Sequence, residues 1–173
     1  MRTRLLAAVA ATLTSLLLFS APAQAAPGDA TCALGTGVTT YTPPITATAG
    51  STTVGETLNL GPCTSLVDPL VTSAQIANSD AVELSCLVTV PGSQSGTVSI
   101  LWNTGESSFF DYTRTTVAVA GQLVTTFTGL ITAGKFSGST GTLVVTALSL
   151  DLLDCLLGSG ISSATSTATL ALI

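Results

Sequence analysis

The stretch that decides the fold of this chain is a run of four segments: GTVSILWN (Gly96–Asn103), SFFDYTRTTVAV (Ser108–Val119), QLVTTFTGLITA (Gln122–Ala133) and TLVVTALSL (Thr142–Leu150). The connections between them contain Thr104-Gly105, Ala120-Gly121 and the loop Gly134–Gly141. Short connections that contain glycine are typical of antiparallel hairpins. The stretch therefore predicts a four-stranded antiparallel meander.

The rest of the chain is expected to add strands to this meander. Apolar and polar residues alternate over Thr36–Thr42, Ile45–Ala49, Thr52–Leu60, Ala81–Val90 and Ser162–Ile173, with an ambiguous short strand at Leu70–Ala77. Pro43-Pro44 is expected to end the first of these strands, and Leu150–Leu157 to form a short helical turn. We predict an all-β, antiparallel β-sandwich, Ig-like or similar, of about 8–10 strands, with a partly closed β-barrel as the alternative.

The first 25 residues have the three parts of a secretory signal peptide. Arg2 and Arg4 form a charged start, Leu5–Phe19 is an apolar run, and Ala23-Gln24-Ala25 is an A-x-A cleavage site. The sequence therefore predicts a signal peptide over 1–25 and a single secreted β-sandwich domain over 26–173. The apolar run is short for a membrane span of about 20 residues, so we expect no membrane association after cleavage.

The mature chain is expected to be acidic and poor in charge. Once Arg2 and Arg4 are removed with the signal peptide, the basic residues that remain are Arg114 and Lys135. Together with nine acidic residues they give a net charge of −7. Such a surface does not neutralise a row of phosphates, so nucleic-acid binding is not expected. Lys135 lies in a glycine-flanked loop, where we expect it to be solvated and not catalytic.

Four cysteines follow the signal peptide: Cys32, Cys63, Cys86 and Cys155. An even number of cysteines in an exported chain predicts two disulfides. A metal site is not expected, because the chain has no histidine and no C-x-x-C pair. Three pairings are possible, and the change from strand to loop at Cys63 and at Cys155 favours Cys63–Cys155 together with Cys32–Cys86.

The chain lacks the groups that common hydrolytic sites require. Without histidine there is no Ser-His-Asp arrangement, and oxidised cysteines supply no thiolate. Carboxylates are then the remaining acid–base groups, and each neighbouring pair is expected to have a surface or structural role: Glu106 with Asp111, Asp80 with Glu83, and Asp151 with Asp154. We therefore predict no catalytic residue, no cofactor-binding residue, no metal ligand and no enzymatic activity.

Aromatic side chains gather around one predicted hairpin. Trp102 shares a face with Val98 and Ile100, which places it in the core. Phe109 and Phe110 point to opposite faces of their strand, so one of the two is expected to be exposed. We take Phe109, Phe110 and Tyr112 as the candidate contact surface.

Several short motifs recur in a fixed order along the chain: Cys32, Gly61-Pro62-Cys63, Ser85-Cys86, WNTG at Trp102–Gly105, TAGKFSG at Thr132–Gly138 and LLDC at Leu152–Cys155. In these motifs the chain resembles a family of small secreted β-proteins, loosely called Ig-like, from high-GC Gram-positive bacteria. The resemblance covers essentially the whole mature chain. It implies an antiparallel β-sandwich or barrel and export, and it carries no catalytic residues to transfer.

Three functional classes stay open. The leading hypothesis is a secreted, non-enzymatic interaction or structural module whose partner is a protein or polysaccharide at the cell surface. The second is a carbohydrate- or cell-wall-binding module that uses the aromatic residues of the Trp102–Tyr112 hairpin. The third is a hydrolase that depends on carboxylates alone, which requires two acidic side chains to converge in a cleft.

Overall fold

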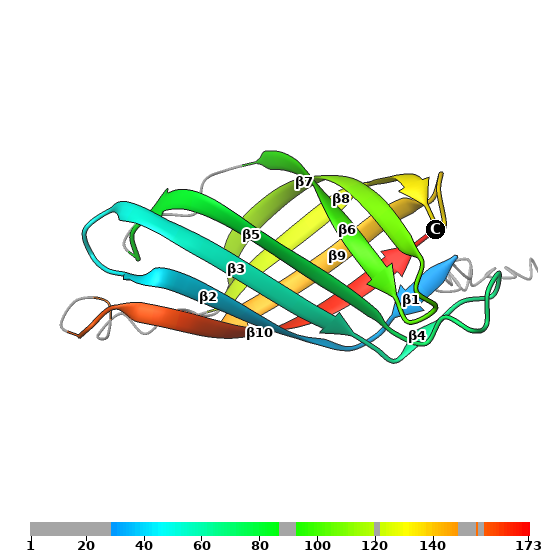
Figure 1. The fold of residues 1–173 in the computed structure, drawn as a ribbon, viewed down its shortest axis with the longest axis horizontal. Helices are drawn as coiled ribbons and strands as arrows, with labels where there is room; N and C mark the ends of the chain where they lie inside the picture. The colour runs from blue at the N-terminus through cyan, green and yellow to red at the C-terminus, as the bar shows by residue number, and fades with distance from the viewer. Residues whose placement is uncertain (1–28, 87–92, 120–121, 149–154, 156–157) are drawn as a thin grey trace, which may run out of the picture.

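The computed structural model describes residues 29–86, 93–119, 122–148, 155 and 158–173. It contains ten strands (Figure 1): β1 (Ala30–Cys32), β2 (Gly35–Ile45), β3 (Gly50–Leu60), β4 (Cys63–Thr64), β5 (Ala74–Leu84), β6 (Gln94–Trp102), β7 (Ser107–Val119), β8 (Gln122–Gly134), β9 (Thr140–Leu148) and β10 (Ile161–Leu172). Neighbouring strands pair antiparallel throughout. The all-β, antiparallel prediction is confirmed.

The sheet closes on itself. Its strands follow the order β2-β3-β5-β6-β7-β8-β9-β10, and β10 also pairs with β2. One half of β10, Ser166–Leu172, pairs with β9, while Ile161–Thr167 pairs with β2. Of the two predicted architectures, the barrel is the one observed, with eight strands in the ring and the short β1 and β4 attached beside β10.

One end of the barrel is packed with apolar side chains. Trp102 and Phe110 are 1% and 0% exposed, and they belong to a core to which most strands contribute. Phe110 needs a neighbour without a side chain, because a Cβ added to Gly141 would lie 2.7 Å from its ring. Tyr112 likewise requires a glycine at position 96, because a Cβ added to Gly96 would lie 2.8 Å from the tyrosine oxygen. Glycine thus makes room for the large rings inside the barrel.

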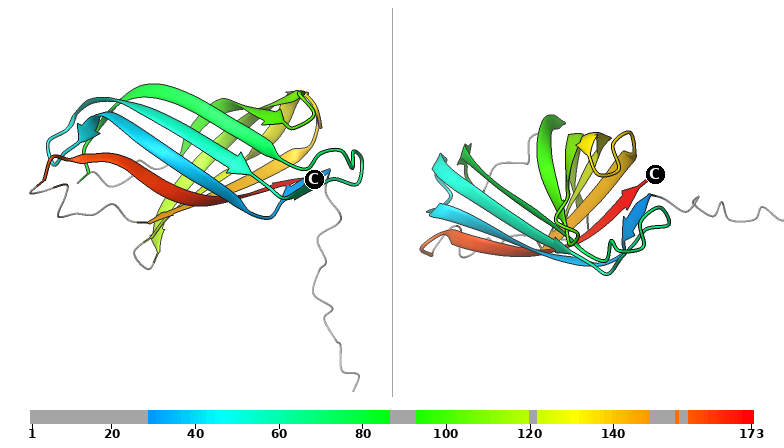
Figure 2. Two further views of the ribbon diagram at one scale, coloured as in Figure 1. Left: turned by 60° about the horizontal axis from the view of Figure 1, so that its bottom comes forward. Right: turned by 45° about the vertical axis from the view of Figure 1, so that its right-hand side comes forward.

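The opposite end of the barrel parts between β5 and β6. These strands pair through three residue pairs, from Ala74 with Trp102 to Ile76 with Ile100, whereas β5 pairs with β3 through eleven. Beyond Ile76 the same face of β5 carries Asn78 and Asp80, which are exposed. In the right-hand view of Figure 2, β2, β3, β5 and β10 fan away from β6–β9. The barrel is therefore closed by side chains at one end and splayed at the other.

Three strand predictions need correction. The strand expected over Ile45–Ala49 is not formed, because residues 46–49 make the bend between β2 and β3. Pro43-Pro44 do not end a strand, because β2 continues to Ile45. Between Thr40 and Ile45 the register with β10 shifts, and the prolines lie in this irregular part, where a missing N–H is tolerated. The separate strands expected at Leu70–Ala77 and Ala81–Val90 are one strand, β5, because its ladder with β3 runs through the polar residues between them.

Other predictions fall outside the described residues. These are the signal peptide over 1–25, the end of the strand expected at Ala81–Val90, and the helical turn expected at Leu150–Leu157 apart from Cys155. The four strands of the meander, by contrast, are present as β6 to β9.

The disulfides are Cys32–Cys63 and Cys86–Cys155, so the predicted pairing is wrong. Cys32 and Cys63 are directly opposite residues of β1 and β4, with Cα atoms 4.0 Å apart. Strands of three and two residues leave too little alternation to be recognised in a sequence. Cys86 follows β5 and Cys155 precedes β10, with Cα atoms 6.1 Å apart, so this bond ties two strands together at the splayed end.

Replacing Cys86 and Cys155 together by Ala should lower the free energy of unfolding by about 2–5 kcal/mol, because a crosslink over a long loop restricts the unfolded chain. Denaturant unfolding followed by circular dichroism measures this change. Non-reducing peptide mapping of the unaltered protein should yield the crosslinks 32–63 and 86–155. Recovery of a Cys63–Cys155 peptide would contradict the observed pairing.

Candidate functional site

Lys135 lies between two carboxylates at the packed end of the barrel. Its Nζ is 2.5 Å from Asp68 Oδ2 and 2.5 Å from Glu106 Oε2, and its side chain is 10% exposed. The ammonium also lies 5.5 Å from the ring centroid of Phe136. The prediction that Lys135 is solvated is therefore wrong, because acidic residues from two other loops converge on it.

The backbone around Lys135 is fixed to the core through Trp102. The indole Nε1 of Trp102 donates to Ser108 Oγ at 2.8 Å, and this hydroxyl donates to the carbonyl of Lys135 at 2.5 Å. The ring of Phe136 stands edge-on to Trp102, with centroids 5.1 Å apart. The prediction that Trp102 is a core residue is confirmed, and its polar edge also positions the β8–β9 loop.

The β4–β5 loop (residues 65–73) is held at the same end. The side chain of Asn103 accepts from the backbone N–H groups of Thr72 and Ser73 at 2.8 and 3.1 Å, and its amide donates to the carbonyl of Leu70 at 2.9 Å. Asp68 Oδ1 accepts from the N–H of Leu70 at 3.0 Å. Val71, which is 1% exposed, anchors the loop in the core. The loop is thus rigidly attached although it projects from the barrel.

This rigid loop presents apolar side chains to solvent. Leu66, Val67 and Leu70, which we term the loop tip, are 72%, 65% and 72% exposed. Asp68 lies among them in the sequence, but its charge is balanced by Lys135. The loop tip is not among the contact residues predicted from the sequence. The signal present in the sequence was the apolar pair Leu66-Val67 next to Asp68-Pro69, in a segment expected to be a loop.

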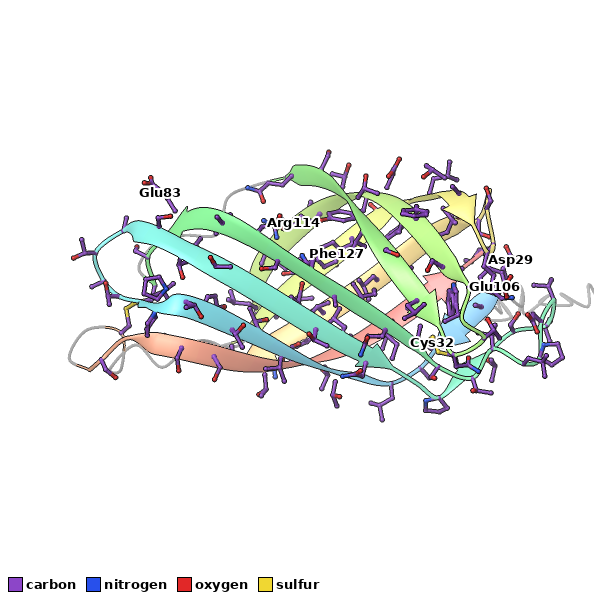
Figure 3. All side chains as sticks on the ribbon, in the orientation of Figure 1. Asp29, Cys32, Glu83, Glu106, Arg114 and Phe127 are labelled. Carbon is purple, nitrogen blue, oxygen red and sulfur yellow. A yellow bond between two sulfur atoms is a disulfide. The ribbon has the colours of Figure 1, made fainter. Side chains whose placement is uncertain are left out.

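A second group of polar side chains lies in the barrel interior, away from the packed end. Burial raises the pKa of Glu56 on β3, and the positive charge of Arg114 on β7 opposes this. Burial, followed by the charge of Glu56, raises the pKa of Tyr41 on β2. Arg114 donates from Nε to Gln94 Oε1 at 2.9 Å and also from its terminal nitrogen. Figure 3 shows Arg114 and Phe127 between the strands in the middle of the barrel.

The structure separates the three residues of the candidate contact surface. Phe109 is 47% exposed on the outer face, whereas Phe110 is fully buried, so their opposite orientation is confirmed. Tyr112 is half-buried and packs inside the barrel, with its ring centroid 5.8 Å from that of Phe110 and 5.0 Å from that of Phe127. Of the three residues, Phe109 is the one that lies on the outer surface.

The carboxylates that converge are not those adjacent in sequence. Glu106 contacts Lys135, whereas Asp111 Oδ1 accepts from Thr97 Oγ1 at 2.6 Å on the outer face of β7. Asp80 and Glu83 are exposed on β5, and Asp151 and Asp154 lie outside the described residues. The converging pair is Asp68 with Glu106, and sequence reasoning missed it because the two residues belong to different loops.

The geometry assigns this pair a structural task. Hydrogen bonds from Lys135 hold the pKa values of Asp68 and Glu106 below their ordinary range, and the two carboxylates raise the pKa of Lys135. All three groups are therefore charged at neutral pH, whereas a general acid needs a pKa near the working pH. The arrangement suits an ion pair that joins three loops.

Within residues 29–86, 93–119, 122–148, 155 and 158–173, no group of three or more His, Cys, Asp or Glu side chains gathers to hold a metal ion. No helix in that part of the chain is long and apolar enough to cross a membrane. The chain matches no protein-family model, no curated protein and no solved structure.

Changing Lys135 to Met should lower the stability of the protein at neutral pH, because two neighbouring carboxylates lose the cation between them. The stabilisation from Asp68 and Glu106 is present above their ordinary pKa values of 3.8 and 4.5 and is lost as the pH falls through their lowered values in the folded protein. The free energy of unfolding, measured from pH 7 to pH 2, should therefore fall less steeply for the variant than for the unaltered protein. The exposed Glu83→Gln change, which leaves the Lys135 ion pairs in place, is the control.

Changing Glu56 to Gln should raise the stability of the protein at neutral pH. Because burial raises the pKa of Glu56, its favourable contribution is present below the ordinary value of 4.5 and is lost as the pH rises through the raised value. Unfolding free energies of the variant and the unaltered protein should therefore differ at pH 7 and converge near pH 4. The exposed Glu83→Gln change is the matched control, and an equal effect from it would count against burial as the cause.

Proposed function

We propose that this chain is an exported, non-enzymatic interaction or structural module that works outside the cell. The observation that carries the proposal is the use made of its charged groups. Lys135 holds Asp68 and Glu106 together, and Arg114 is bound by Gln94. The described acids that converge are thus neutralised by a lysine rather than facing a substrate across a cleft.

Two features support export. Disulfides form and persist in oxidising compartments outside the cytoplasm. This chain has two disulfides, one at each end of its barrel. The signal peptide expected over 1–25 agrees with this location. We therefore propose that the mature chain acts in the extracellular space or in association with the cell wall, as in the family that its motifs resemble.

The outer surface suits an uncharged partner. Ser95, Thr113, Thr128 and Thr142 lie side by side in one row across β6 to β9, and all four are exposed. Hydroxyl groups both donate and accept hydrogen bonds, and Leu130, two residues after Thr128 on the same face of β8, adds apolar area. A neutral protein surface or a polysaccharide fits this chemistry better than a highly charged partner does.

Hydrolysis assays on the purified, oxidised protein test the main proposal. We expect no activity toward peptide, ester or glycoside substrates under conditions in which both disulfides are intact. An activity that copurifies with the protein and is lost in a Glu56→Gln or Glu106→Gln variant would overturn the proposal in favour of a carboxylate-dependent hydrolase.

Phe109 favours polysaccharide binding as a second candidate function, because it places an exposed ring beside this hydroxyl-rich face. The protein should then be retained on insoluble cell-wall polysaccharide, and Phe109→Ala should weaken retention roughly fivefold, the equivalent of about 1 kcal/mol for one aromatic contact. Val117→Ala, on the same face of β7 and 55% exposed, is the matched control. Absence of retention on any polysaccharide would remove this second candidate.

A further inference from the structure

We infer that residues 77–84 of β5 form an open strand edge that binds an extended, positively charged peptide segment of another extracellular protein. The peptide adds to the sheet as a further strand in the gap between β5 and β6, away from the hydroxyl row across β6 to β9. This inference rests on the proposed function and names a class of partner for it. Two observations carry it: the unpaired backbone of β5 and the charge of the side chains beside that backbone.

The edge of β5 that faces β6 has no strand partner over most of its length. Beyond Ile76 no described residue pairs with this side of β5, so residues 77–84 are bound to β3 alone (Figure 2). The exposure agrees with this, because residues 77–83 are all exposed, on the inner face as well as on the outer. Every second residue of such an edge directs its N–H and C=O groups into the gap, where a further strand can pair with them.

This edge is held in the extended form that a further strand requires. β3 pairs with β5 along its whole length without a register shift. At the far end, the N–H of Cys86 donates to the carbonyl of Thr46 at 3.0 Å, and the Cys86–Cys155 disulfide attaches the same residue to the chain ahead of β10. A strand fixed along one side and at its end loses little conformational entropy when a peptide pairs with it.

Acidic side chains beside the edge select the charge of the peptide. By strand alternation Asp80 points to the inner face of β5 and Glu83 to the outer face, and both are exposed (Figure 3 labels Glu83). In the part of the chain that the structure describes, neither carboxylate forms an ion pair, since Lys135 and Arg114 are engaged elsewhere. A lysine directly opposite either acid on an added strand makes a cross-strand pair of opposite charge, which stabilises a sheet.

The same acids disfavour a second copy of this chain at the edge. Pairing two β5 edges would bring the acids of one copy beside those of the other, and like charges on facing strands destabilise a sheet. An inward-pointing charge such as Asp80 also opposes pairing with an apolar strand. The whole chain has a formal net charge of −5, which attracts basic segments over a distance at low ionic strength. The partner that fits is therefore a basic strand.

The synthetic peptide Val-Lys-Val-Thr-Lys-Thr-Val-Thr is a direct probe of this edge. When it pairs antiparallel with residues 77–84, its two lysines lie opposite Glu83 and Asp80. With a fluorescent label on the peptide, anisotropy during titration with the oxidised protein measures the Kd. The same peptide with glutamate in place of both lysines should bind roughly tenfold more weakly or worse. Raising the salt concentration from ~0.05 M to ~0.5 M should weaken binding of the lysine peptide.

Methylation of the peptide backbone separates strand addition from simple charge attraction. Methyl groups on the alternate amides that face β5 remove the hydrogen bonds of the ladder, whereas methyl groups on the remaining amides point away from β5. One methylated peptide should therefore lose binding, and the other should bind within about twofold of the parent. On binding of the parent peptide, hydrogen exchange should slow at every second amide of residues 77–84.

A charge reversal at Asp80 locates the peptide on the protein. Asp80→Lys should weaken binding of the lysine peptide roughly tenfold and strengthen binding of the glutamate peptide. Asp80→Asn, which removes one negative charge, should have a smaller effect in the same direction. The matched control is Thr142→Lys, an exposed change on β9 that alters the net charge by the same amount and should leave the Kd within about twofold. Thermal unfolding of each variant confirms that it is folded.

Three outcomes would overturn this inference. The first is no binding of the lysine peptide at ~1 mM, and the second is equal binding of the two methylated peptides or of the lysine and glutamate peptides. The third is self-association of the unaltered protein that slows the same amides of residues 77–84, which would assign the edge to a second copy. None of these outcomes bears on the absence of hydrolytic activity, so a failure of the inference and a failure of the proposed function are distinguishable.

Discussion

The pairing of β10 with two neighbours at once is the constraint on which the rest of this structure depends. Ser166 and Thr167 pair with β9 on one side and with β2 on the other, so the sheet has no free edge there. The close contact needs Gly37, because a Cβ at that position would lie 2.2 Å from Ser166 Oγ and 2.5 Å from Leu58 Cδ2. A side chain at Gly37 would force β2 away from β10. The single enclosed interior, and with it the common core of Trp102 and Phe110, follows from this closure.

Local alternation predicts strands well and their distant partners poorly. The meander was predictable because each of its hairpins joins strands that follow one another, and Trp102 shares a parity with Ile100. A partly closed barrel was one of the two predicted architectures, but which strands close the ring was not predictable. The alternation in β10 shows which face is buried and not that its far edge meets β2. The stretch Asn78–Asp80, which lies between the strands expected at Leu70–Ala77 and Ala81–Val90, is missed as a strand for a related reason. Its polar residues look like a turn, and the ladder with β3 overrides that preference.

The candidate site depends even more on distant partners. Lys135 meets Asp68 and Glu106 across 67 and 29 positions, a convergence that loop composition does not reveal. The feature of the sequence that could have indicated these ion pairs is the scarcity of charged residues. In a chain with two basic residues after residue 25, a lysine between glycines is valuable as a counter-ion for acids that would otherwise stand alone. Asn103 gave a similar hint, because an amide in a tight turn can satisfy the backbone of a neighbouring loop.

The three-pair seam between β5 and β6 divides the ring into two mechanical units. One unit is β2, β3, β5 and β10, held by long ladders and tied at its far end by Cys86–Cys155; the other is the meander. Few backbone hydrogen bonds join β5 to β6, and these few lie at the packed end, where Ile76, Ile100 and Trp102 are buried in the core. Beyond Ile76 the described residues of β5 pair with β3 and not with β6. Apolar packing around Trp102 therefore joins the two units at this seam, and a change that weakens this packing would also release β5 from β6.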